Sequence, residues 1–222
     1  MTYNHFQARL CPYSSSPDPI RAIWTHQHVC VAESLDWYND RQPTQAGMVN
    51  AIIKELKQGH YDVLRSAHAT VNFSGFPHAA AMQWRTHQAM GTLTQSLRYT
   101  GQRFQDKGWL TAKEISELFY VRDNDQIEIF RQGIDNYNIQ IKHYGAKMEV
   151  ARDVLPSGYL QGWSTSGDLK AWFHLFDRRL PKDTQEEARI AAEMAVEQLT
   201  AWCPDLLGWF MKHRAGKNKL AP

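Results

Sequence analysis

The sequence predicts an α+β fold: a helix-rich single domain with a small, mostly antiparallel sheet. In several segments apolar residues recur at intervals of three and four, which is the spacing of an amphipathic helix. Residues 66–74 instead alternate apolar and polar side chains, as a strand with one buried face does. No internal repeat, low-complexity tract or linker divides the chain, so we expect residues 1–222 to form one domain.

Composition and charge argue against several classes of protein. The formal net charge is only +2, so we expect no broad field for a nucleic-acid polymer or a membrane surface. No apolar run is long enough to cross a bilayer, and the first residues lack the pattern of a signal peptide. Eight Trp, nine Tyr and nine Phe residues supply the apolar surface of a sizeable core. We therefore expect a cytoplasmic protein.

The cysteines do not predict a zinc site or a disulfide framework. Cys11, Cys30 and Cys203 are widely spaced and form no Cys-x-x-Cys pair, which fits a reduced protein. No metal ion is expected. The basic residues between 212 and 219 are expected to remain solvated.

The first third of the chain gives one clear helix and one clear strand. Residues 13–19 read as a loop, whereas residues 23–32 suit either a strand or a helix. A helix is predicted over residues 44–57, with Gly59 as its C-cap. The strand over residues 66–74 is expected to end at Gly75.

The next stretch, residues 83–99, is rich in Arg, His, Gln and Ser and holds no carboxylate. Pro77 suits the first position of a helix, which Gly91 would break, and residues 95–99 are expected to be extended. Guanidinium, amide and hydroxyl groups suit a planar, anionic ligand. The alternative, a polar helix end followed by a strand, fits the pattern alone equally well.

The second half of the chain is predicted to be helical. Thr111 and Glu114 form a capping-box pattern that opens a short helix. A longer helix is expected over residues 125–150, with Gly133 and Gly145 as places where it can break. Two further helices are predicted over residues 168–176, capped by Ser166, and over residues 184–202, ended by Pro204.

Several short motifs occur in an order and spacing that match one enzyme family. They are Gly59-His60, Gln83 followed by His87, Ser96-Leu97-Arg98-Tyr99, the Ala-Arg-Asp-Val-Leu-Pro of residues 151–156, the His-Leu-Phe-Asp-Arg-Arg of residues 174–179, and Thr184-Gln185. Together they span roughly residues 45–200. In this order they resemble the motifs of flavin-dependent thymidylate synthases, which are unrelated to the thiol-dependent thymidylate synthases.

The sequence departs from that family mostly where the family holds its flavin. The two arginines of the Arg-His-Arg signature fall on Thr86 and Gln88, and Arg85, one residue early, is a candidate substitute. Three other family motifs are replaced here: Ser-Pro-x-Glu-His by residues 62–66, Asn-Glu by Leu93-Thr94, and Asn-x-Arg by Asp168-Leu169-Lys170. The positions that bind the nucleotide in the family are better kept.

The resemblance implies deoxyuridine monophosphate (dUMP) as the substrate. The residues that it implies for nucleotide binding are Gln83, Ser96, Leu97, Arg98, Arg152 and Arg179. On an extended chain Ser96 and Arg98 point to the same side and can grip the phosphate together. Spacing alone favours a surface ion pair for Arg98, a preference that the resemblance reverses. For Arg152 an ion pair with Glu149 or Asp153 is the alternative.

Arg179 is the residue to which the resemblance gives a catalytic role. A cation against the pyrimidine ring would stabilise the negative charge that develops as C5 becomes nucleophilic. The alternative is solvation of a helix end beside Arg178.

For FAD the resemblance implies His60, Arg85, Thr86, His87, Gln88, Asp168, Lys170 and His174. The three histidines would line the flavin and Lys170 would lie near its phosphates, the alternative for each histidine being an ordinary hydrogen bond in the core or at the surface. In this family reduced flavin supplies hydride, 5,10-methylenetetrahydrofolate supplies the one-carbon unit, and NADPH reduces the flavin.

Three functions remain open at this point. The first is a methyltransferase that converts dUMP to its C5-methylated product, assembled as a homotetramer whose sites draw on more than one subunit. The second is a related pyrimidine nucleotide 5-hydroxymethylase or methylase that takes dUMP, UMP or dCMP. The third is a nucleotide-binding homologue without catalysis.

Overall fold

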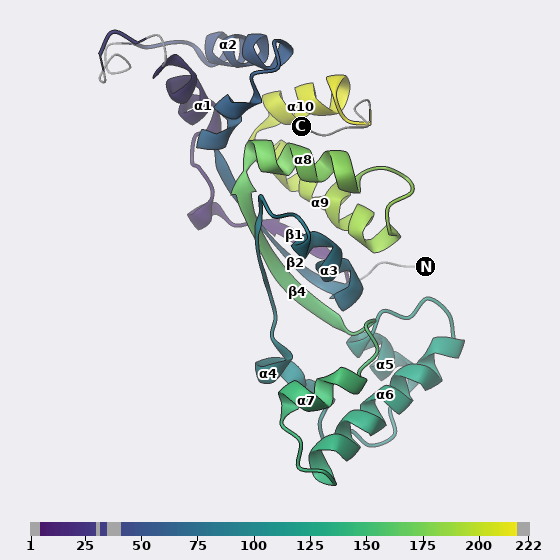
Figure 1. The fold of residues 1–222 in the computed structure, drawn as a ribbon. Coiled ribbons are helices and arrows are strands. Elements are labelled where there is room, and N and C mark those ends of the chain that lie inside the picture. The colour runs from purple at the N-terminus through teal and green to yellow at the C-terminus, as the bar shows by residue number, and fades with distance from the viewer. Residues whose placement is uncertain (1–4, 30–31, 35–40, 217–222) are drawn as a thin grey trace. The chain divides into compact units, whose positions relative to one another are not determined.

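A computed structural model describes residues 5–29, 32–34 and 41–216 (Figure 1). Its strands are β1 (Gln7–Leu10), β2 (His68–Pro77), β3 (Gly91–Thr94) and β4 (Leu160–Asp168). Its helices are α1 (Pro19–His28), α2 (Gln45–Lys57), α3 (His78–Arg85), α4 (Leu97–Thr100), α5 (Ala112–Leu118), α6 (Asp125–Lys142), α7 (Met148–Ala151), α8 (Leu169–Arg179), α9 (Glu186–Trp202) and α10 (Pro204–His213). The predicted fold class, a helix-rich α+β fold with a small antiparallel sheet, is confirmed.

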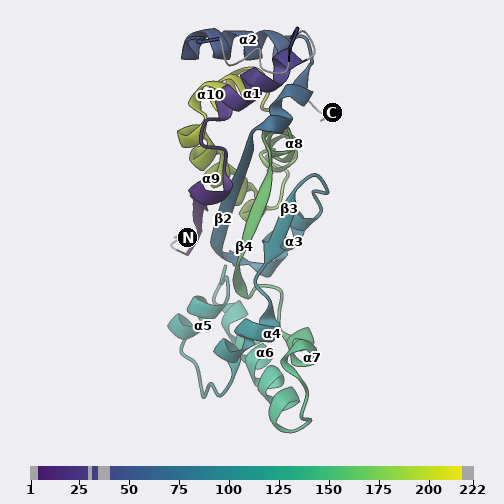
Figure 2. The ribbon, with the colours of Figure 1, turned by 90° about the vertical axis from the view of Figure 1, so that its left-hand side faces the viewer.

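The four strands pair in the order β1-β2-β4-β3, and Figure 2 shows β2, β4 and β3 side by side. Strand β4 was not predicted from the sequence. Its first four residues, 160–163, are all buried, so the strand lacks the polar–apolar alternation that marks one-sided burial. Gly162 within it also lowers strand propensity, yet a Cβ there would lie 2.7 Å from the carbonyl oxygen of Phe73.

Strand β2 is longer than predicted and continues past Gly75 to Pro77. Gly75 has φ of +78°, and a Cβ atom on it would lie 1.8 Å from the carbonyl oxygen of His5. The glycine therefore allows this close approach of the two backbones, and it does not end the strand. Pro77 is the N-cap of α3, one residue before the helical position predicted for it.

The chain forms two compact units that alternate along the sequence. Unit 1 comprises Met1–Gln7, Phe73–Thr86 and Leu93–Trp163, and unit 2 comprises Ala8–Asn72, His87–Thr92 and Ser164–Pro222. The chain passes between them within each of the four strands and also between Thr86 and His87. That all 222 residues act as one domain stays a prediction.

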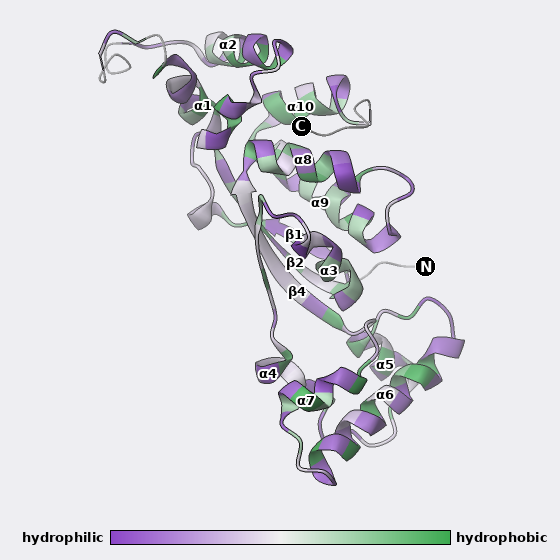
Figure 3. Ribbon diagram, viewed as in Figure 1, coloured by the Kyte–Doolittle hydropathy of each residue, from purple (hydrophilic) through white to green (hydrophobic). Residues whose placement is uncertain are grey.

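Unit 1 has a core under α5, α6 and α7. Its larger members are Leu97, Phe104, Ile115, Phe119, Phe130, Ile134, Tyr137 and Tyr159. Hydrophobic and hydrophilic residues alternate along α6 in Figure 3, as the predicted stripe requires. The helix predicted over residues 125–150 is broken after Lys142, because Gly145 takes φ of +62°, and α7 follows. The capping box of Thr111 and Glu114 is confirmed.

Unit 2 contains α1, α2, α8, α9 and α10. Residues 23–32, left open between strand and helix, include the end of helix α1, which Asp18 caps. Thr44 caps the start of α2. Its C-cap is Gln58, and Gly59, the predicted C-cap, follows one residue later with φ of +88°. The cap of α8 is Asp168, whose carboxylate accepts the Ala171 N–H, and not Ser166, which lies in β4.

The C-terminal helix α10 was not predicted, because Pro204 was read as a stop. Proline lacks an N–H and so also suits the first turn of a helix, and here it opens α10 directly after α9. Helices α8, α9 and α10 lie side by side (Figure 1). Cys203, between α9 and α10, is buried, while Cys30 lies outside the described residues.

The expectation that the basic C-terminal residues stay solvated is wrong for Arg214. Its side chain is only 4% exposed and donates from Nε and Nη2 to Oδ2 of Asp177, which is 1% exposed. The guanidinium also lies 4.3 Å from the ring centre of Tyr61. Lys217 and Lys219 lie outside the described residues. In the described part of the chain, no helix has the length and apolar character needed to span a membrane.

We predict that Arg214→Met lowers the free energy of unfolding by about 3–5 kcal/mol, because it leaves the Asp177 carboxylate buried without its cation. Urea titration followed by circular dichroism measures the change. Arg189→Met, which breaks the more exposed pair with Glu193, should cost less than about 1 kcal/mol. Equal losses in the two variants would contradict a structural role for the buried pair.

Candidate functional site

The stretch over residues 83–99 crosses the end of one helix and the start of another. Gln83 and Arg85 lie on α3, and the Thr86 hydroxyl donates to the Gln83 carbonyl at 2.7 Å as the helix ends. Arg85, Thr86 and Gln88 are exposed, whereas His87 is buried. The stretch therefore presents one buried imidazole among solvated polar side chains.

The prediction that residues 95–99 are extended is wrong. Ser96 is the N-cap of α4, and its hydroxyl accepts the N–H of Arg98. A serine at an N-cap satisfies an otherwise unpaired helix N–H, and this local gain outweighs the extended alternative. Leu97 is buried in the core of unit 1. Ser96 and Arg98 are still close together, but through a helical turn rather than along a strand.

Two carboxylates contact the nucleotide-binding arginines predicted in unit 1. Arg98 Nε lies 2.8 Å from Oε2 of Glu149 on α7, and the Arg98 side chain is 59% exposed. Arg152, which follows α7, lies 3.9 Å from the Asp153 carboxylate. The surface ion pairs that spacing alone suggested are thus present. Helix α4 packs against α7, so the structure brings Arg98 close to the segment that carries Arg152.

Three of the residues predicted to bind FAD are engaged within unit 2. Nδ1 of His60 lies 2.8 Å from Glu55, and Nζ of Lys170 lies 3.0 Å from Asp62, which also binds Arg65. Lys170 and Arg65 both lower the pKa of the Asp62 carboxyl. The Asp168 carboxylate caps α8.

A different kind of contact joins His87, Arg179 and His174. Nε of Arg179, the last residue of α8, donates to Nε2 of His87 at 2.8 Å. The rings of His87 and His174 meet edge to face, with their centres 6.2 Å apart. All three residues belong to unit 2. The residue predicted to be catalytic is therefore bound to one of the residues predicted to bind flavin.

The charge state of this cluster follows from the hydrogen bond and from burial. A guanidinium nitrogen can only donate, so Nε2 of His87 must be unprotonated. Burial lowers the pKa of His87 to about 4, and the nearby Arg179, His174 and Arg178 act in the same direction. Burial and Arg178 also lower the pKa of Arg179, which still remains charged at neutral pH. His87 is thus a neutral imidazole beside the guanidinium groups of Arg178 and Arg179.

The donor set of this cluster fits the isoalloxazine ring or phosphates of FAD. Nδ1 of His174 is buried and has no hydrogen-bond partner among the described residues. A buried polar atom without a partner is costly unless a ligand or water satisfies it. Among the described residues no group of three or more His, Cys, Asp or Glu side chains is arranged to hold a metal ion.

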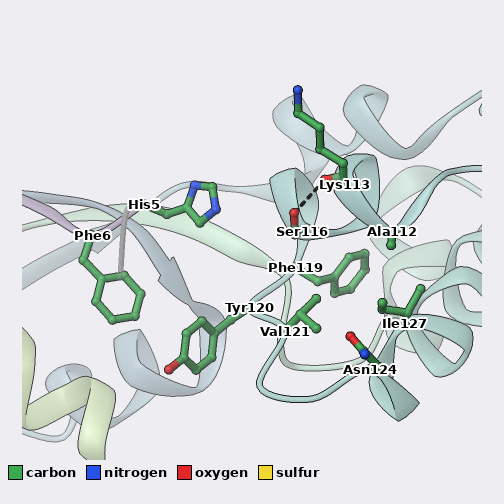
Figure 4. A pocket seen from close by; sticks show the side chains of 10 residues that line it. All are labelled: His5, Phe6, Ala112, Lys113, Ser116, Phe119, Tyr120, Val121, Asn124 and Ile127. Carbon is green, nitrogen blue, oxygen red and sulfur yellow. Dashed lines mark hydrogen bonds between the residues drawn. The ribbon is translucent and has the colours of Figure 1, made fainter. Parts of the chain in front are cut away.

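A cavity of about 490 Å³ lies elsewhere in unit 1 (Figure 4). Phe6, Phe119 and Tyr120 form its aromatic wall, and Lys113 and Ser116 lie at its edge. None of the predicted ligand-binding residues lines it. The chemistry implied by the sequence therefore lies outside this cavity.

Glu149 and Asp62, the partners of Arg98 and Lys170, were not predicted from the sequence. The Asp62–Arg65 pair has the i, i+3 spacing that a sequence can reveal. The other two contacts join residues far apart in the chain, and so does the hydrogen bond from Arg179 to His87. No local pattern predicts them.

The sequence matches the family model described as thymidylate synthase complementing protein over residues 9–205, a wider span than the motifs covered. A search of curated proteins finds no match.

Solved structures share the fold. A structure of thymidylate synthase X (ThyX) from Helicobacter pylori with FAD and dUMP has a TM-score of 0.76 at 13% identity, covering 94% of this chain and 100% of that chain. A second Helicobacter pylori ThyX complex with FAD and dUMP gives 0.72 at 13% identity, covering 88% and 95%. PolB, a UMP/dUMP methylase from Streptomyces cacaoi bound with 5-Br dUMP, gives 0.70 at 16% identity, covering 93% and 95%.

We predict that His87 titrates near pH 4 in the folded protein, against about 6.5 for an exposed histidine. The C2–H signal of His87, assigned by its loss in His87→Gln, measures this in an NMR pH titration. Because the folded state holds this imidazole neutral, stability should fall as the pH drops from about 6.5 to about 4, and less steeply in His87→Gln. A midpoint for His87 above pH 6 would contradict the buried, arginine-bound imidazole.

Proposed function

The chain belongs to the thymidylate synthase complementing protein family, and on this premise we propose that it is a flavin-dependent thymidylate synthase. In this proposal it methylates C5 of dUMP, with 5,10-methylenetetrahydrofolate as the one-carbon donor and NADPH as the reductant of its FAD. The observation that carries the proposal is Arg179, a charged, half-buried guanidinium held by His87 beside His174. That arrangement suits a ligand with a polar, conjugated ring.

The nucleotide phosphate is bound in unit 1 by Arg98 and Ser96, supported by Gln83 and Arg152. Arg98 already holds a carboxylate, Glu149, at 2.8 Å. An exposed ion pair of this kind stabilises a protein by about 0–1 kcal/mol, so a phosphate with more charge and more acceptor oxygens can displace it at little cost.

Arg179 is the catalytic residue of the proposal. Its guanidinium contacts the pyrimidine ring and stabilises the negative charge that develops there as C5 becomes nucleophilic. Partial burial strengthens this effect, because a charge acts over a longer range where water is excluded.

The resemblance assigns the FAD to His87 and His174, with Lys170 near its phosphates. Bound and reduced, the flavin supplies the hydride that completes the methyl group. His174 offers its unpartnered Nδ1 atom, and Lys170 exchanges Asp62 for a phosphate. The imidazole of His60 is exposed and contacts Glu55. His60 is therefore the weakest candidate among the residues predicted to bind the flavin. We also propose a cytoplasmic homotetramer, as the resemblance implies.

The proposal is tested by flavin binding and by product analysis. Titration with FAD should quench flavin fluorescence with saturation below about 100 μM, a generous limit for a cofactor site. Mass spectrometry of reactions with dUMP, UMP or dCMP should then show a methyl group added to dUMP. A hydroxymethyl product, or turnover of another nucleotide, would identify the second function left open by the sequence. Absence of saturable FAD binding would rule out both enzymatic functions.

Arg98→Ala should weaken dUMP binding by about thirtyfold, because a charged hydrogen bond to phosphate contributes on the order of 2 kcal/mol. FAD affinity should stay within twofold, since Arg98 is not among the residues proposed to hold the flavin. Isothermal titration with each ligand measures both constants. Glu149→Gln should strengthen dUMP binding by removing the competing carboxylate.

Lys113→Ala serves as the control for Arg98→Ala. It removes a cation of the same unit that lies at the unrelated cavity, and it should leave both affinities unchanged. Equal weakening of dUMP and FAD binding in Arg98→Ala would point to a folding defect instead.

A further inference from the structure

We propose that His87 is a positioning residue for Arg179, whose guanidinium it holds for the pyrimidine ring, and that this role, rather than contact with flavin, is its main one. The inference rests on the proposed function. It changes the assignment that the resemblance gave to His87.

The geometry of the contact between Arg179 and His87 supports this role. Arg179 donates to His87 Nε2 at 2.8 Å from Nε, the guanidinium nitrogen that is bonded to the aliphatic part of the side chain. Fixing Nε fixes the plane of the guanidinium, because the group is rigid and planar. The imidazole itself is 9% exposed, so its own orientation is set by packing. A buried, oriented acceptor is what a positioning contact requires.

The neutral charge of the His87 acceptor also supports this role. Arg98 meets a carboxylate through its Nε, which compensates part of its charge. At Arg179 the acceptor is an imidazole surrounded by Arg178, Arg179 and His174, which disfavour its protonation. A neutral acceptor orients the guanidinium without compensating its positive charge. In the proposed function His87 therefore takes up none of the charge with which Arg179 stabilises the developing anion in the transition state.

Nε2 of His87 cannot bind both the arginine and the flavin. With Nε2 of His87 accepting from Arg179, that atom is not available to a flavin. The neighbouring His174, by contrast, has a buried Nδ1 atom with no partner among the described residues. The structure thus separates the two histidines: His174 suits a ligand, and His87 suits the arginine.

A double-mutant cycle tests the proposal on the holoenzyme. His87→Phe should lower kcat/KM for dUMP by about 10- to 100-fold, mostly through kcat, as loss of a charged hydrogen bond predicts. His87→Gln, which keeps an acceptor oxygen, should recover part of this loss. In the Arg179→Ala background His87→Phe should have no further effect. FAD affinity should stay within threefold throughout.

Two outcomes of this cycle would overturn the proposal. The first is an equal effect of His87→Phe with and without Arg179. The second is a loss of FAD affinity as large as the loss of activity, which would restore the flavin role. His68→Phe, an exposed histidine of unit 2, is the matched control and should change neither quantity.

A second measurement does not depend on activity. In protein labelled with ¹⁵N-arginine, the Nε–H signal of Arg179 is assigned by its loss in Arg179→Ala. It should exchange slowly with solvent in the wild type and in His68→Phe, and rapidly in His87→Phe. An unchanged signal in His87→Phe would refute the contact. If the wild type forms no methylated product, the proposed function fails, and this signal still decides whether His87 holds Arg179.

Discussion

The pairing of β2 with β4 is the constraint on which the candidate site of unit 2 depends. Where the two strands adjoin, the N–H of Leu169 donates to the carbonyl of Ala67 at 2.8 Å, and α8 begins there. Three residues on, the buried indole N–H of Trp172 donates to the carbonyl of Ala69. Both bonds tie α8 to the start of β2. A slip of one residue in this register would turn the buried faces outward and displace Arg179 at the end of the helix.

The same constraint explains how far the site could be predicted from the sequence. Signals that act within a few residues predicted the Thr111–Glu114 capping box correctly, and placed the end of α2 at Gly59 to within one residue. Strand β4 was not predicted because burial on both faces removes the alternation by which strands are recognised in a sequence. Without β4 in the prediction, Ser166 is given as the cap of the following helix, although Ser166 lies in the strand and Asp168 is the cap.

Local signals also compete with one another, and the sequence does not state which one prevails. Ser96 reads equally well as a strand residue and as a helix cap, and the structure makes it a cap. The contacts that define the site lie beyond such signals altogether. Arg179 and His87 are 92 residues apart, and only the folded chain shows that one donates to the other. The motifs therefore predict the candidate residues, and the fold determines their partners.

The partners divide the cations of the proposed site into two kinds. Arg98 and Lys170 hold carboxylates on the surface, Glu149 and Asp62, in contacts that screening by water keeps weak. A phosphate replaces such a carboxylate with little loss, so these cations suit the charged ends of nucleotides. Arg179 instead meets an imidazole that burial keeps neutral. Because its charge is oriented but not compensated by that partner, it suits an anion that forms only during the reaction. In the proposed function, differences in partner, rather than in residue type, thus distinguish the cations that bind the nucleotide and the cofactor from the cation that acts in catalysis.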